Sequence, residues 1–257
     1  MKLTVDHLCF GYPGKPLGRN VSLTVMTGEV LCLLGPNGSG KTTLFKTLLG
    51  LLPPQGGAIT LDGSALGHWS RRRLAQRMAY VPQAHTAYFP YTVLDIVLMG
   101  RTAHLDLFAT PSQRDIDIAA AALQALHIAA LRDEVYTQIS GGQRQLVMIA
   151  RALAQEPGFL VLDEPTASLD FGNQVVVLKH IKALAKGGIG IILSTHDPDH
   201  AFACADRVAL LYDGGLLCTG PPREVMTPAN LYLLYGVEVD VIPLAGSERW
   251  ICVPQLR

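Results

Sequence analysis

A glycine-rich segment near the start of the chain has the residue types needed to hold a chain of phosphates. It reads Gly35-Pro36-Asn37-Gly38-Ser39-Gly40-Lys41-Thr42 and lies between an apolar run and a predicted helix. Glycines let the backbone amides approach phosphate oxygens, and the helix amino end adds partial positive charge. Lys41 can reach the β- and γ-phosphates, and the Thr42 hydroxyl can bind Mg²⁺. The pattern predicts a P-loop whose binding residues are Asn37, Gly38, Ser39, Gly40, Lys41, Thr42 and Thr43.

Two adjacent carboxylates follow a second apolar run, Phe159-Leu160-Val161-Leu162. Asp163 could hold Mg²⁺ through water, and Glu164 could orient and deprotonate an attacking water. The alternative is a helix cap beside a surface charge. Because the same chain carries a P-loop, the magnesium and water roles are favoured for Asp163 and Glu164.

A second loop that could face phosphate lies between these two motifs. Ser140-Gly141-Gly142-Gln143 opens a predicted helix, 99 residues after Lys41 and with Asp163 following 20 residues after Gln143. Helix amino ends favour anions, although an ordinary N-cap with flexible glycines would look the same. The chain would then carry two phosphate cradles in separate lobes. The simplest use of both is a two-fold dimer, in which each nucleotide lies between one copy's P-loop and the other copy's Ser-Gly-Gly loop.

The elements around these motifs alternate between strand and helix. Strands are predicted in residues 2–33, 58–61, 78–81, 159–162, 189–194 and 207–212, and helices in 41–51, 143–155 and 173–186. From about residue 84 to residue 157 strand signals are missing and helical periodicity dominates. This pattern predicts an alternating α/β domain with a helical insertion near its middle.

Two groups of charged residues in these elements are expected on helix surfaces rather than in a functional site. Ser112 followed by Asp115 indicates a helix start, and Asp115 and Asp117 are expected on the helix surface. Arg71-Arg72-Arg73 is expected on a solvated helix face, with contact to a partner as the alternative.

The composition argues against several function classes. Among the 257 residues, 21 Lys and Arg balance 21 Asp and Glu, so a basic field that attracts nucleic acid is not indicated. The mean hydropathy of +0.27 hints at surface covered by a partner. No stretch of about 20 apolar residues predicts a membrane span, and no apolar signal-peptide core follows the start. Five scattered cysteines indicate reduced thiols in a cytosolic protein.

Taken together, these motifs resemble those of the ATP-binding cassette (ABC) family over nearly the whole chain. Ser140-Gly141-Gly142-Gln143 matches the family's signature loop. The resemblance implies a P-loop, RecA-like, mostly parallel sheet core with an amino-terminal antiparallel β subdomain and an inserted α-helical subdomain. Residues 1–84 and 158–257 would form the core, and residues 85–157 the helical signature subdomain, of a single nucleotide-binding domain spanning 1–257.

Three further residues match family positions. Tyr12, 29 residues before Lys41, matches the aromatic that stacks on adenine. Gln83 matches the glutamine that touches Mg²⁺ or water, and His196 matches the switch histidine that contacts the γ-phosphate. Each also has a structural alternative: a buried strand aromatic, a polar loop residue and a histidine with a structural role.

The resemblance implies an ATPase that uses ATP and Mg²⁺. The residues implied in hydrolysis are Lys41, Gln83, Glu164 and His196. Those implied around Mg²⁺ are Thr42, Gln83 and Asp163. Asp170 ends a segment that matches the D-loop, which crosses the dimer interface, and it is grouped with the nucleotide-binding residues.

The segment after Gln83 is similar to one branch of the family. Residues 89–104 contain a Gly-Arg-x-x-His pattern at Gly100, Arg101 and His104. They are similar to type II importer subunits for iron-siderophores, haem, cobalamin and related metal-containing cargo, and some molybdate or tungstate importers share the pattern. There this region builds the groove that receives a coupling helix of the permease.

This branch implies where the chain works and with what. The implied partners are a second copy of the chain, an integral-membrane permease homodimer and, indirectly, a periplasmic or extracellular substrate-binding protein. The chain would lie peripherally on the cytoplasmic face of the inner membrane. Two other functions remain open: a soluble ABC ATPase in cofactor assembly or translation, and a P-loop kinase, which would not need residues 140–143.

Overall fold

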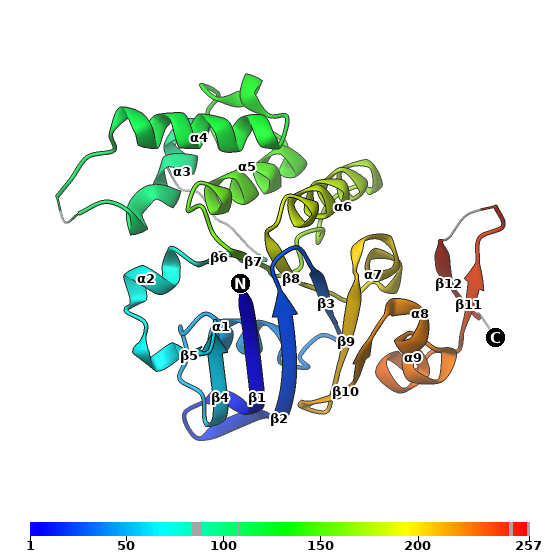
Figure 1. Cartoon of the computed structure of the whole chain (residues 1–257). Helices are drawn as coiled ribbons and strands as arrows, with labels where there is room; N and C mark the ends of the chain where they lie inside the picture. The colour runs from blue at the N-terminus through cyan, green and yellow to red at the C-terminus, as the bar shows by residue number, and fades with distance from the viewer. Residues whose placement is uncertain (84–88, 107, 247–248, 256–257) are drawn as a thin grey trace.

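The computed structural model describes residues 1–83, 89–106, 108–246 and 249–255 (Figure 1). The described residues form a six-stranded sheet, a four-stranded sheet and a two-stranded hairpin. The order of the six-stranded sheet is β10 (Gly215–Gly220), β9 (Arg207–Tyr212), β3 (Val30–Leu34), β8 (Gly190–Thr195), β7 (Phe159–Leu162) and β6 (Met78–Val81). Only the β10–β9 pair is antiparallel, so the prediction of a mostly parallel core is confirmed.

The four-stranded sheet is antiparallel throughout, as predicted for the amino-terminal part of the chain. Its order is β2 (Lys15–Met26), β1 (Lys2–Tyr12), β4 (Gly56–Leu61) and β5 (Ser64–Ala65). Helix α1 (Lys41–Leu48) shares an apolar cluster with both sheets, and its Leu44, Phe45 and Leu48 are fully buried. The P-loop that precedes α1 is therefore held on a rigid base.

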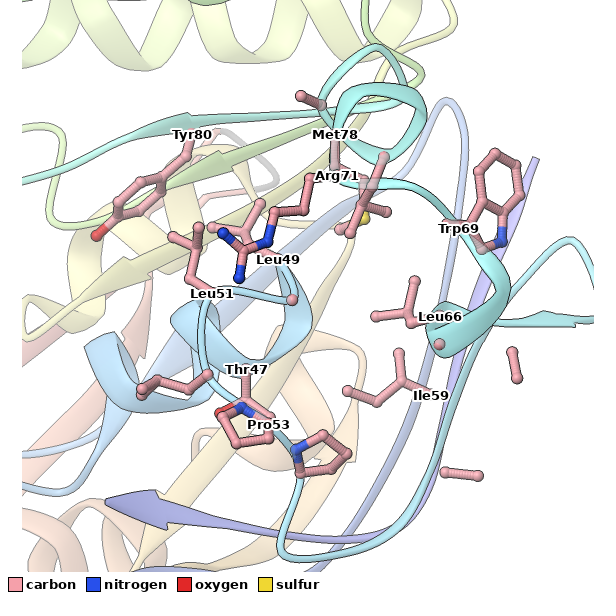
Figure 2. A pocket seen from close by; sticks show the side chains of 18 of the residues that line it. Thr47, Leu49, Leu51, Pro53, Ile59, Leu66, Trp69, Arg71, Met78 and Tyr80 are labelled. Atoms are coloured by element: carbon pink, nitrogen blue, oxygen red, sulfur yellow. The ribbon is translucent and has the colours of Figure 1, made fainter. Parts of the chain in front are cut away.

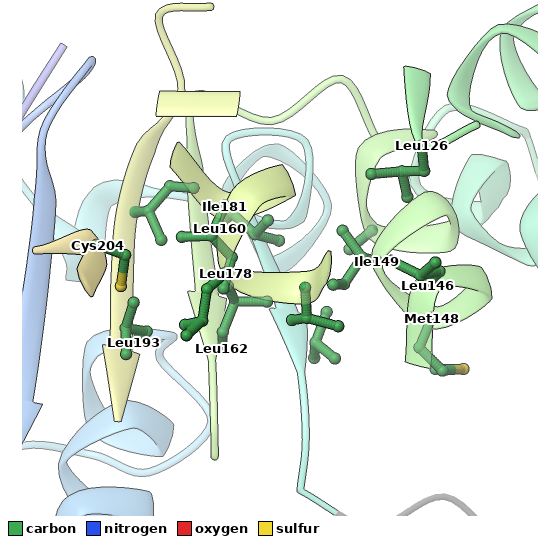
Figure 3. Packing of buried hydrophobic residues seen from close by; sticks show 14 of the residues in the cluster. Leu126, Leu146, Met148, Ile149, Leu160, Leu162, Leu178, Ile181, Leu193 and Cys204 are labelled. Atoms are coloured by element: carbon green, nitrogen blue, oxygen red, sulfur yellow. The ribbon is translucent and has the colours of Figure 1, made fainter. Parts of the chain in front are cut away.

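The parallel strands are buried on both faces, which explains their unbroken apolar sequences. In β3, Leu31 and Leu33 join the cluster around α1, whereas Cys32 and Leu34 join a second cluster on the other face. Helices α5 (Gly141–Leu153), α6 (Phe171–Lys186) and α7 (Pro198–Cys204) contribute to that second cluster, as Figure 3 shows. The helical region is thus packed continuously onto the sheet.

Short helices gather at one end of the molecule around α5 (Figure 1). They are α3 (Val93–Leu98), η2 (Met99–Ala103), α4 (Gln113–Ala125) and η3 (Ala129–Leu131). Capping boxes start α3 at Thr92 and α4 at Ser112. The predicted division between core and helical subdomain stays a prediction, because its first boundary, between residues 84 and 85, lies outside the described residues.

The remaining elements surround the core. They are η1 (Leu66–His68), α2 (Arg71–Ala75), α8 (Pro222–Val225), α9 (Pro228–Tyr235), β11 (Val239–Pro243) and β12 (Trp250–Pro254). The β11–β12 hairpin packs on α7, where the Cys252 amide donates a hydrogen bond to Asp199 Oδ1 at 2.8 Å. Within the described ranges, no helix has the length and apolarity that crossing a bilayer requires.

Helix boundaries differ from the sequence prediction by two or three residues, and two of the differences have a clear local cause. Helix α1 ends at Leu48 rather than at residue 51, because Gly50 takes a left-handed φ of 67° that ends the helical path. Helix α5 begins at Gly141 rather than at residue 143, because Ser140 caps it and both glycines accept helical geometry.

The expectation that Asp115 lies on the surface is wrong. The Asp115 side chain is buried, accepts hydrogen bonds from the Ser112 amide and hydroxyl, and pairs with Arg101 Nε at 2.9 Å. These bonds, first from Ser112 and then from Arg101, hold the pKa of the Asp115 carboxyl well below its usual range. The capping box was visible in the sequence, but the buried Arg101 beside it was not.

We predict that Asp115→Asn lowers the free energy of unfolding by about 1–3 kcal/mol, because it leaves the buried Arg101 guanidinium poorly paired. A carboxyl with a lowered folded-state pKa stabilises the fold above its unfolded pKa of about 3.9. The deficit should therefore be full at neutral pH and shrink as the pH falls below about 4. Urea unfolding as a function of pH measures it, with exposed Asp117→Asn as the control; a constant deficit would contradict the ionic origin.

Candidate functional site

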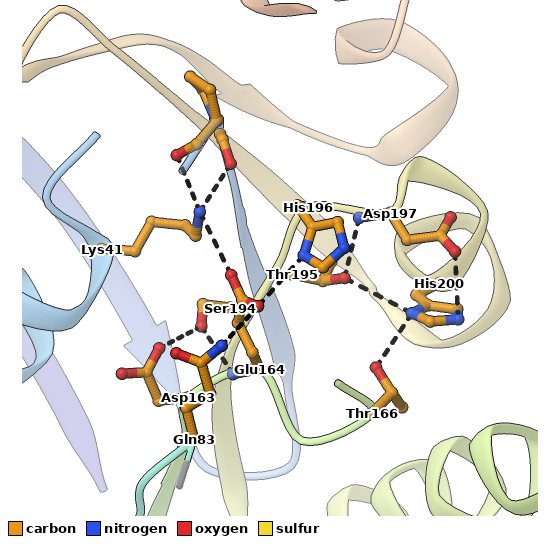
Figure 4. A network of polar contacts seen from close by, with 12 residues as sticks. Lys41, Gln83, Asp163, Glu164, Thr166, Ser194, Thr195, His196, Asp197 and His200 are labelled. Carbon is orange, nitrogen blue, oxygen red and sulfur yellow. Dashed lines mark hydrogen bonds and ion pairs between the residues drawn. The ribbon is translucent and has the colours of Figure 1, made fainter. Parts of the chain in front are cut away.

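The predicted catalytic residues meet where neighbouring parallel strands end. The P-loop follows β3, Asp163 and Glu164 follow β7, and His196 follows β8, which lies between β3 and β7. Because parallel strands end at one edge of a sheet, side chains from distant parts of the sequence come together there. Figure 4 shows them converging on the Glu164 carboxylate.

The P-loop has the geometry of an anion cradle. Gly38 and Gly40 take left-handed φ angles of 82° and 97°, which residues with a side chain rarely adopt. Gly40 caps α1 without any side-chain bond to the first helical amides. The Ser39 hydroxyl is buried and has no hydrogen-bond partner among the described residues. Asn37 and Gly38 are exposed at the tip of the loop, where phosphate oxygens could approach the backbone amides. The unpartnered Ser39 hydroxyl is a further donor for them.

Lys41 is buried at the start of α1, with 6% of its surface exposed. Its Nζ donates hydrogen bonds to the Gly35 and Pro36 carbonyls at 2.7 and 3.0 Å and lies 3.6 Å from Glu164 Oε1. Burial lowers the pKa of the Lys41 ammonium, whereas the Glu164 carboxylate opposes this shift. A buried cation at this position is suited to neutralising the charge of a phosphate.

Glu164 is held by three side chains. Besides Lys41, Gln83 Nε2 lies 3.3 Å and His196 Nδ1 3.1 Å from its Oε2, and the carboxylate is only 9% exposed. Its backbone takes a left-handed φ of 48°, which costs about 1–3 kcal/mol for a residue other than glycine. Strain of this kind is typical of a side chain whose direction is fixed by the surrounding structure.

One serine that the sequence analysis missed positions both carboxylates. Ser194 Oγ donates to Asp163 Oδ1 at 2.7 Å and accepts from the Glu164 amide at 2.9 Å, and the residue is fully buried. Strand register explains its position: β7 and β8 pair Leu162 with Leu193, so Ser194 lies beside Asp163. Knowledge of this pairing would have been needed to find it from the sequence. The Tyr80 hydroxyl completes the setting with a 3.3 Å bond to the second oxygen of Asp163.

A second histidine, His200, supports the loop that carries His196. His200 Nδ1 lies 3.1 Å from the Thr166 hydroxyl and 3.5 Å from the Thr195 hydroxyl. Its Nε2 lies 3.3 Å from Asp197 Oδ2. The turn around His196 is thereby tied to the segment that follows Glu164.

The residues predicted for magnesium offer the oxygen ligands that Mg²⁺ prefers. Thr42 carries its hydroxyl on the first turn of α1, and Asp163 lies directly after β7. Within the described residues no cluster of three or more His, Cys, Asp or Glu side chains could hold a metal. A single carboxylate with a hydroxyl and an amide fits an ion that also takes phosphate oxygens and water.

Two other predicted residues flank the site from different elements. Tyr12 ends β1 with 40% of its surface exposed, so its ring is free to stack on a base, and its carbonyl accepts a 2.9 Å bond from Gln55. Thr43, one residue after Thr42, is buried on the first turn of α1.

The second predicted cradle lies apart from these residues. Ser140 caps α5 by a reciprocal pair of bonds with Gln143, at 3.2 and 2.9 Å, and both Ser140 and Gly141 are exposed. No hydrogen bond or ion pair among the described residues joins Ser140–Gln143 to Lys41 or Glu164. The structure therefore groups the predicted site residues into two sets that do not meet within one chain.

Asp170 belongs to the second set. It caps α6, and its two carboxylate oxygens accept from the amide and side chain of Asn173, both at 2.8 Å. A Cβ atom added to Gly142 would lie 2.3 Å from the Asn173 side chain, so glycine allows α5 to start close against α6. The signature loop and the end of the D-loop segment are consequently neighbours.

Comparison with known proteins identifies the family. The ABC transporter family model matches residues 18–167 of the chain. The chain belongs to the ABC transporter family, as an ATPase domain. An ABC transporter ATP-binding protein of Haemophilus influenzae, whose role is uncharacterised, is 46% identical over 94% of this chain and 92% of its own length. The hemin import ATP-binding protein HmuV of Nocardia farcinica is 40% identical over 96% of this chain and 85% of its own.

A solved structure agrees with this assignment. A metal-chelate type ABC transporter in an inward-facing conformation has a chain that is 34% identical, with a TM-score of 0.88 and coverage of 99% of this chain and 98% of that chain. This ABC ATPase domain is therefore similar throughout its length to a transporter's nucleotide-binding subunit, and the predicted resemblance to the type II importer branch is confirmed.

We predict that Ser194→Ala lowers kcat by about 10–100-fold, the usual effect of removing a side chain that hydrogen-bonds to a metal ligand and fixes its orientation. Asp163 and the Glu164 backbone would both lose their shared hydroxyl, so the Mg²⁺ concentration for half-maximal activity should rise as well. ATPase assays across a Mg²⁺ series measure both effects. Ser22→Ala, which removes an exposed hydroxyl from β2, is the control. A loss of activity with unchanged Mg²⁺ dependence would contradict the role at Asp163.

Proposed function

We propose that this chain is the ATP-hydrolysing subunit of an importer, that it closes head to tail with a second copy when ATP binds, and that it drives uptake of a metal-containing cargo. The printed names of its relatives, hemin import and metal-chelate type transporter, support the cargo class. Iron-siderophore, haem, cobalamin and molybdate or tungstate belong to this class. The convergence of Lys41, Gln83 and His196 on the Glu164 carboxylate is the observation that carries the proposed ATPase mechanism.

In this mechanism each side chain has a defined task. Glu164 orients the attacking water and takes its proton, and His196 holds the γ-phosphate and the Glu164 carboxylate together. Lys41 neutralises charge that develops on the transferred phosphoryl group. Mg²⁺, held through Thr42, Gln83 and Asp163, would supply further charge neutralisation. Tyr12 stacks on the adenine, and the backbone amides of residues 38–43 hold the phosphates.

The separation of the two residue sets supports the two-copy arrangement. Ser140 and Gly141 are exposed, and no hydrogen bond or ion pair among the described residues joins them to the P-loop of their own chain, so their natural use is on another copy's nucleotide. ATP then stabilises the closed pair because it contacts both halves. ADP and phosphate lack the bridging γ-phosphate and release it.

A groove beside the core suits the permease. It has a volume of about 910 Å³, and most of the side chains that line it are apolar (Figure 2). Trp69 and Gln155 are among its lining residues, whereas none of residues 89–104 is. A short apolar helix of the permease would cover these apolar side chains.

In this proposal the chain lies peripherally on the cytoplasmic face of the membrane, bound to a permease homodimer that receives cargo from a binding protein. We retain residues 85–157 as the proposed helical signature subdomain, inserted in a core of residues 1–84 and 158–257. Purification of the chain with a polytopic membrane protein, and stimulation of its ATPase activity by cargo in the reconstituted complex, would separate import from a role in cofactor assembly.

We predict that Glu164→Gln keeps ATP binding but lowers kcat by about 10²–10⁴-fold, because the amide cannot accept the proton of water. The variant should therefore accumulate as an ATP-bound dimer. Phosphate release and sedimentation velocity with ATP and Mg²⁺ measure the two effects. The exposed substitution Glu134→Gln is the control, and hydrolysis by Glu164→Gln at the wild-type rate would refute the assignment of the base.

We predict that Ser140→Arg abolishes turnover without weakening ATP binding to the monomer, because the bulky cation fills the loop that should face the other copy's nucleotide. ATP affinity measured in dilute protein reports binding to the monomer, and kcat at high protein concentration reports turnover by the dimer. An equal loss of affinity and turnover would contradict the assignment of Ser140 to the other copy's nucleotide.

A mixing experiment sharpens this test. Lys41→Ala removes the P-loop cation, so a mixed dimer of a Lys41→Ala chain and a Ser140→Arg chain contains one composite site that is intact. With each chain also carrying Glu164→Gln, ATP should promote association of differently tagged chains in the mixture but not of either chain alone. Absence of that ATP-dependent association would count against the head-to-tail pairing.

A further inference from the structure

The Gly-Arg-x-x-His pattern of residues 100–104 has a structural role that its association with cargo does not explain. The segment forms η2 and lies against the carboxyl end of α5. A Cβ atom on Gly100 would stand 2.1 Å from the Arg151 carbonyl oxygen, so only glycine permits this close approach. The backbone of η2 is thereby brought directly onto the last turn of α5.

Arg101 and His104 supply donors to the carbonyls at this helix end. Arg101 donates through one guanidinium nitrogen to the Ala154 carbonyl at 2.6 Å, and His104 Nε2 lies 2.9 Å from the Gln155 carbonyl. Carbonyls at the end of a helix lack partners within it, and cationic or N–H side chains bind them favourably. The end of α5 is fixed by residues outside that helix.

Arg101 and His104, which we call the Arg101 cluster, are also bound by residues of other elements. The Arg101 guanidinium also pairs with Asp115 at the start of α4 and with Glu156 Oε2, at 2.9 and 2.8 Å, and only 4% of Arg101 is exposed. On α2, Arg72 donates to the Ala103 and His104 carbonyls at 3.0 and 3.1 Å. Four elements are therefore joined at one point.

The opposite end of α5 carries the signature loop. The helix has 13 residues and is therefore about 20 Å long, with Ser140 at one end and the Arg101 cluster at the other. Ser140 and Gly141 are exposed, and the hydrogen bonds of Ser140 are to Gln143 and Arg144 of the same helix. The position of the loop thus depends on how firmly the body of α5 is held, including at its far end.

We propose that Arg101 and His104 are positioning residues for ATP hydrolysis: by fixing the carboxyl end of α5 they set where Ser140-Gly141-Gly142 stands against the nucleotide of the second copy. This rests on the proposed head-to-tail dimer. Both residues lie at the end of α5 that is opposite the Ser140 loop, so they would act through the helix. Because a two-fold dimer contains two copies of each helix, any loss of anchoring counts twice in the dimerisation equilibrium.

The test uses ATP-induced dimerisation of the full chain carrying Glu164→Gln. In this background His104→Leu should raise the protein concentration for half-dimerisation by about tenfold or more, since each copy loses one hydrogen bond at the helix end. ATP affinity of the dilute monomer should stay within twofold. His104→Gln should restore dimerisation, because its amide can donate to the same carbonyl. His7→Leu, in the antiparallel sheet, is the matched control.

Arg101→Lys provides an independent variant. It keeps a cation beside Asp115 but has no planar fork to reach the Ala154 carbonyl at the same time. It should weaken dimerisation to a similar degree, again with unchanged monomer affinity for ATP.

The possible results separate this inference from the proposed function. Dimerisation of His104→Leu and Arg101→Lys at the parent's concentration would overturn the inference and leave the dimer intact. A parallel fall in monomer ATP affinity, or failure of His104→Gln to recover what His104→Leu loses, would show a general structural role and also overturn it. If the Glu164→Gln parent itself stayed monomeric with ATP, the proposed dimer and this inference would both be refuted.

Discussion

The placement of one carboxylate, that of Glu164, constrains most of the chain. Its oxygens receive contacts from α1, from the segment after β6 and from the turn after β8, while its strained backbone is held by a serine on β8. These groups can meet only if β3, β6, β7 and β8 run parallel and end at one edge. The apolar clusters on both faces of the sheet make that arrangement possible, because they bury β3, β7 and β8 completely.

A second constraint separates the chain into regions with different tasks. The core brings the P-loop together with Asp163 and Glu164, whereas no described hydrogen bond or ion pair joins the loop that caps α5 to Lys41 or Glu164. Glycine permits close packing at both ends of α5: Gly142 admits the Asn173 side chain of α6, and Gly100 admits the backbone of the last turn of α5. The two glycines lie in different sequence motifs, but each is explained by what packs against α5.

The sequence predicted most of the fold because its signals are local. Apolar runs that end at glycine or acidic residues marked β3 and β7, and Ser140 marked the start of α5. Residues whose importance depends on register or on burial were missed. Ser194 required the pairing of β7 with β8, and Asp115 required knowledge that Arg101 is buried beside it. The role of His200 was not predicted either, because its bonds to the Thr166 and Thr195 hydroxyls depend on how the chain folds around it.

Helix α5 has both of its ends defined by specific contacts, which makes its length a fixed quantity. Removing or adding one residue within it would rotate one end about 100° relative to the other and shift it by about 1.5 Å. The capping serine would then point in a different direction while the anchored end stayed in place. Substitutions on the exposed side of this helix are therefore compatible with its geometry, whereas insertions and deletions are not. The number of residues in α5 fixes both the distance and the relative rotation between the capping serine and the anchored end.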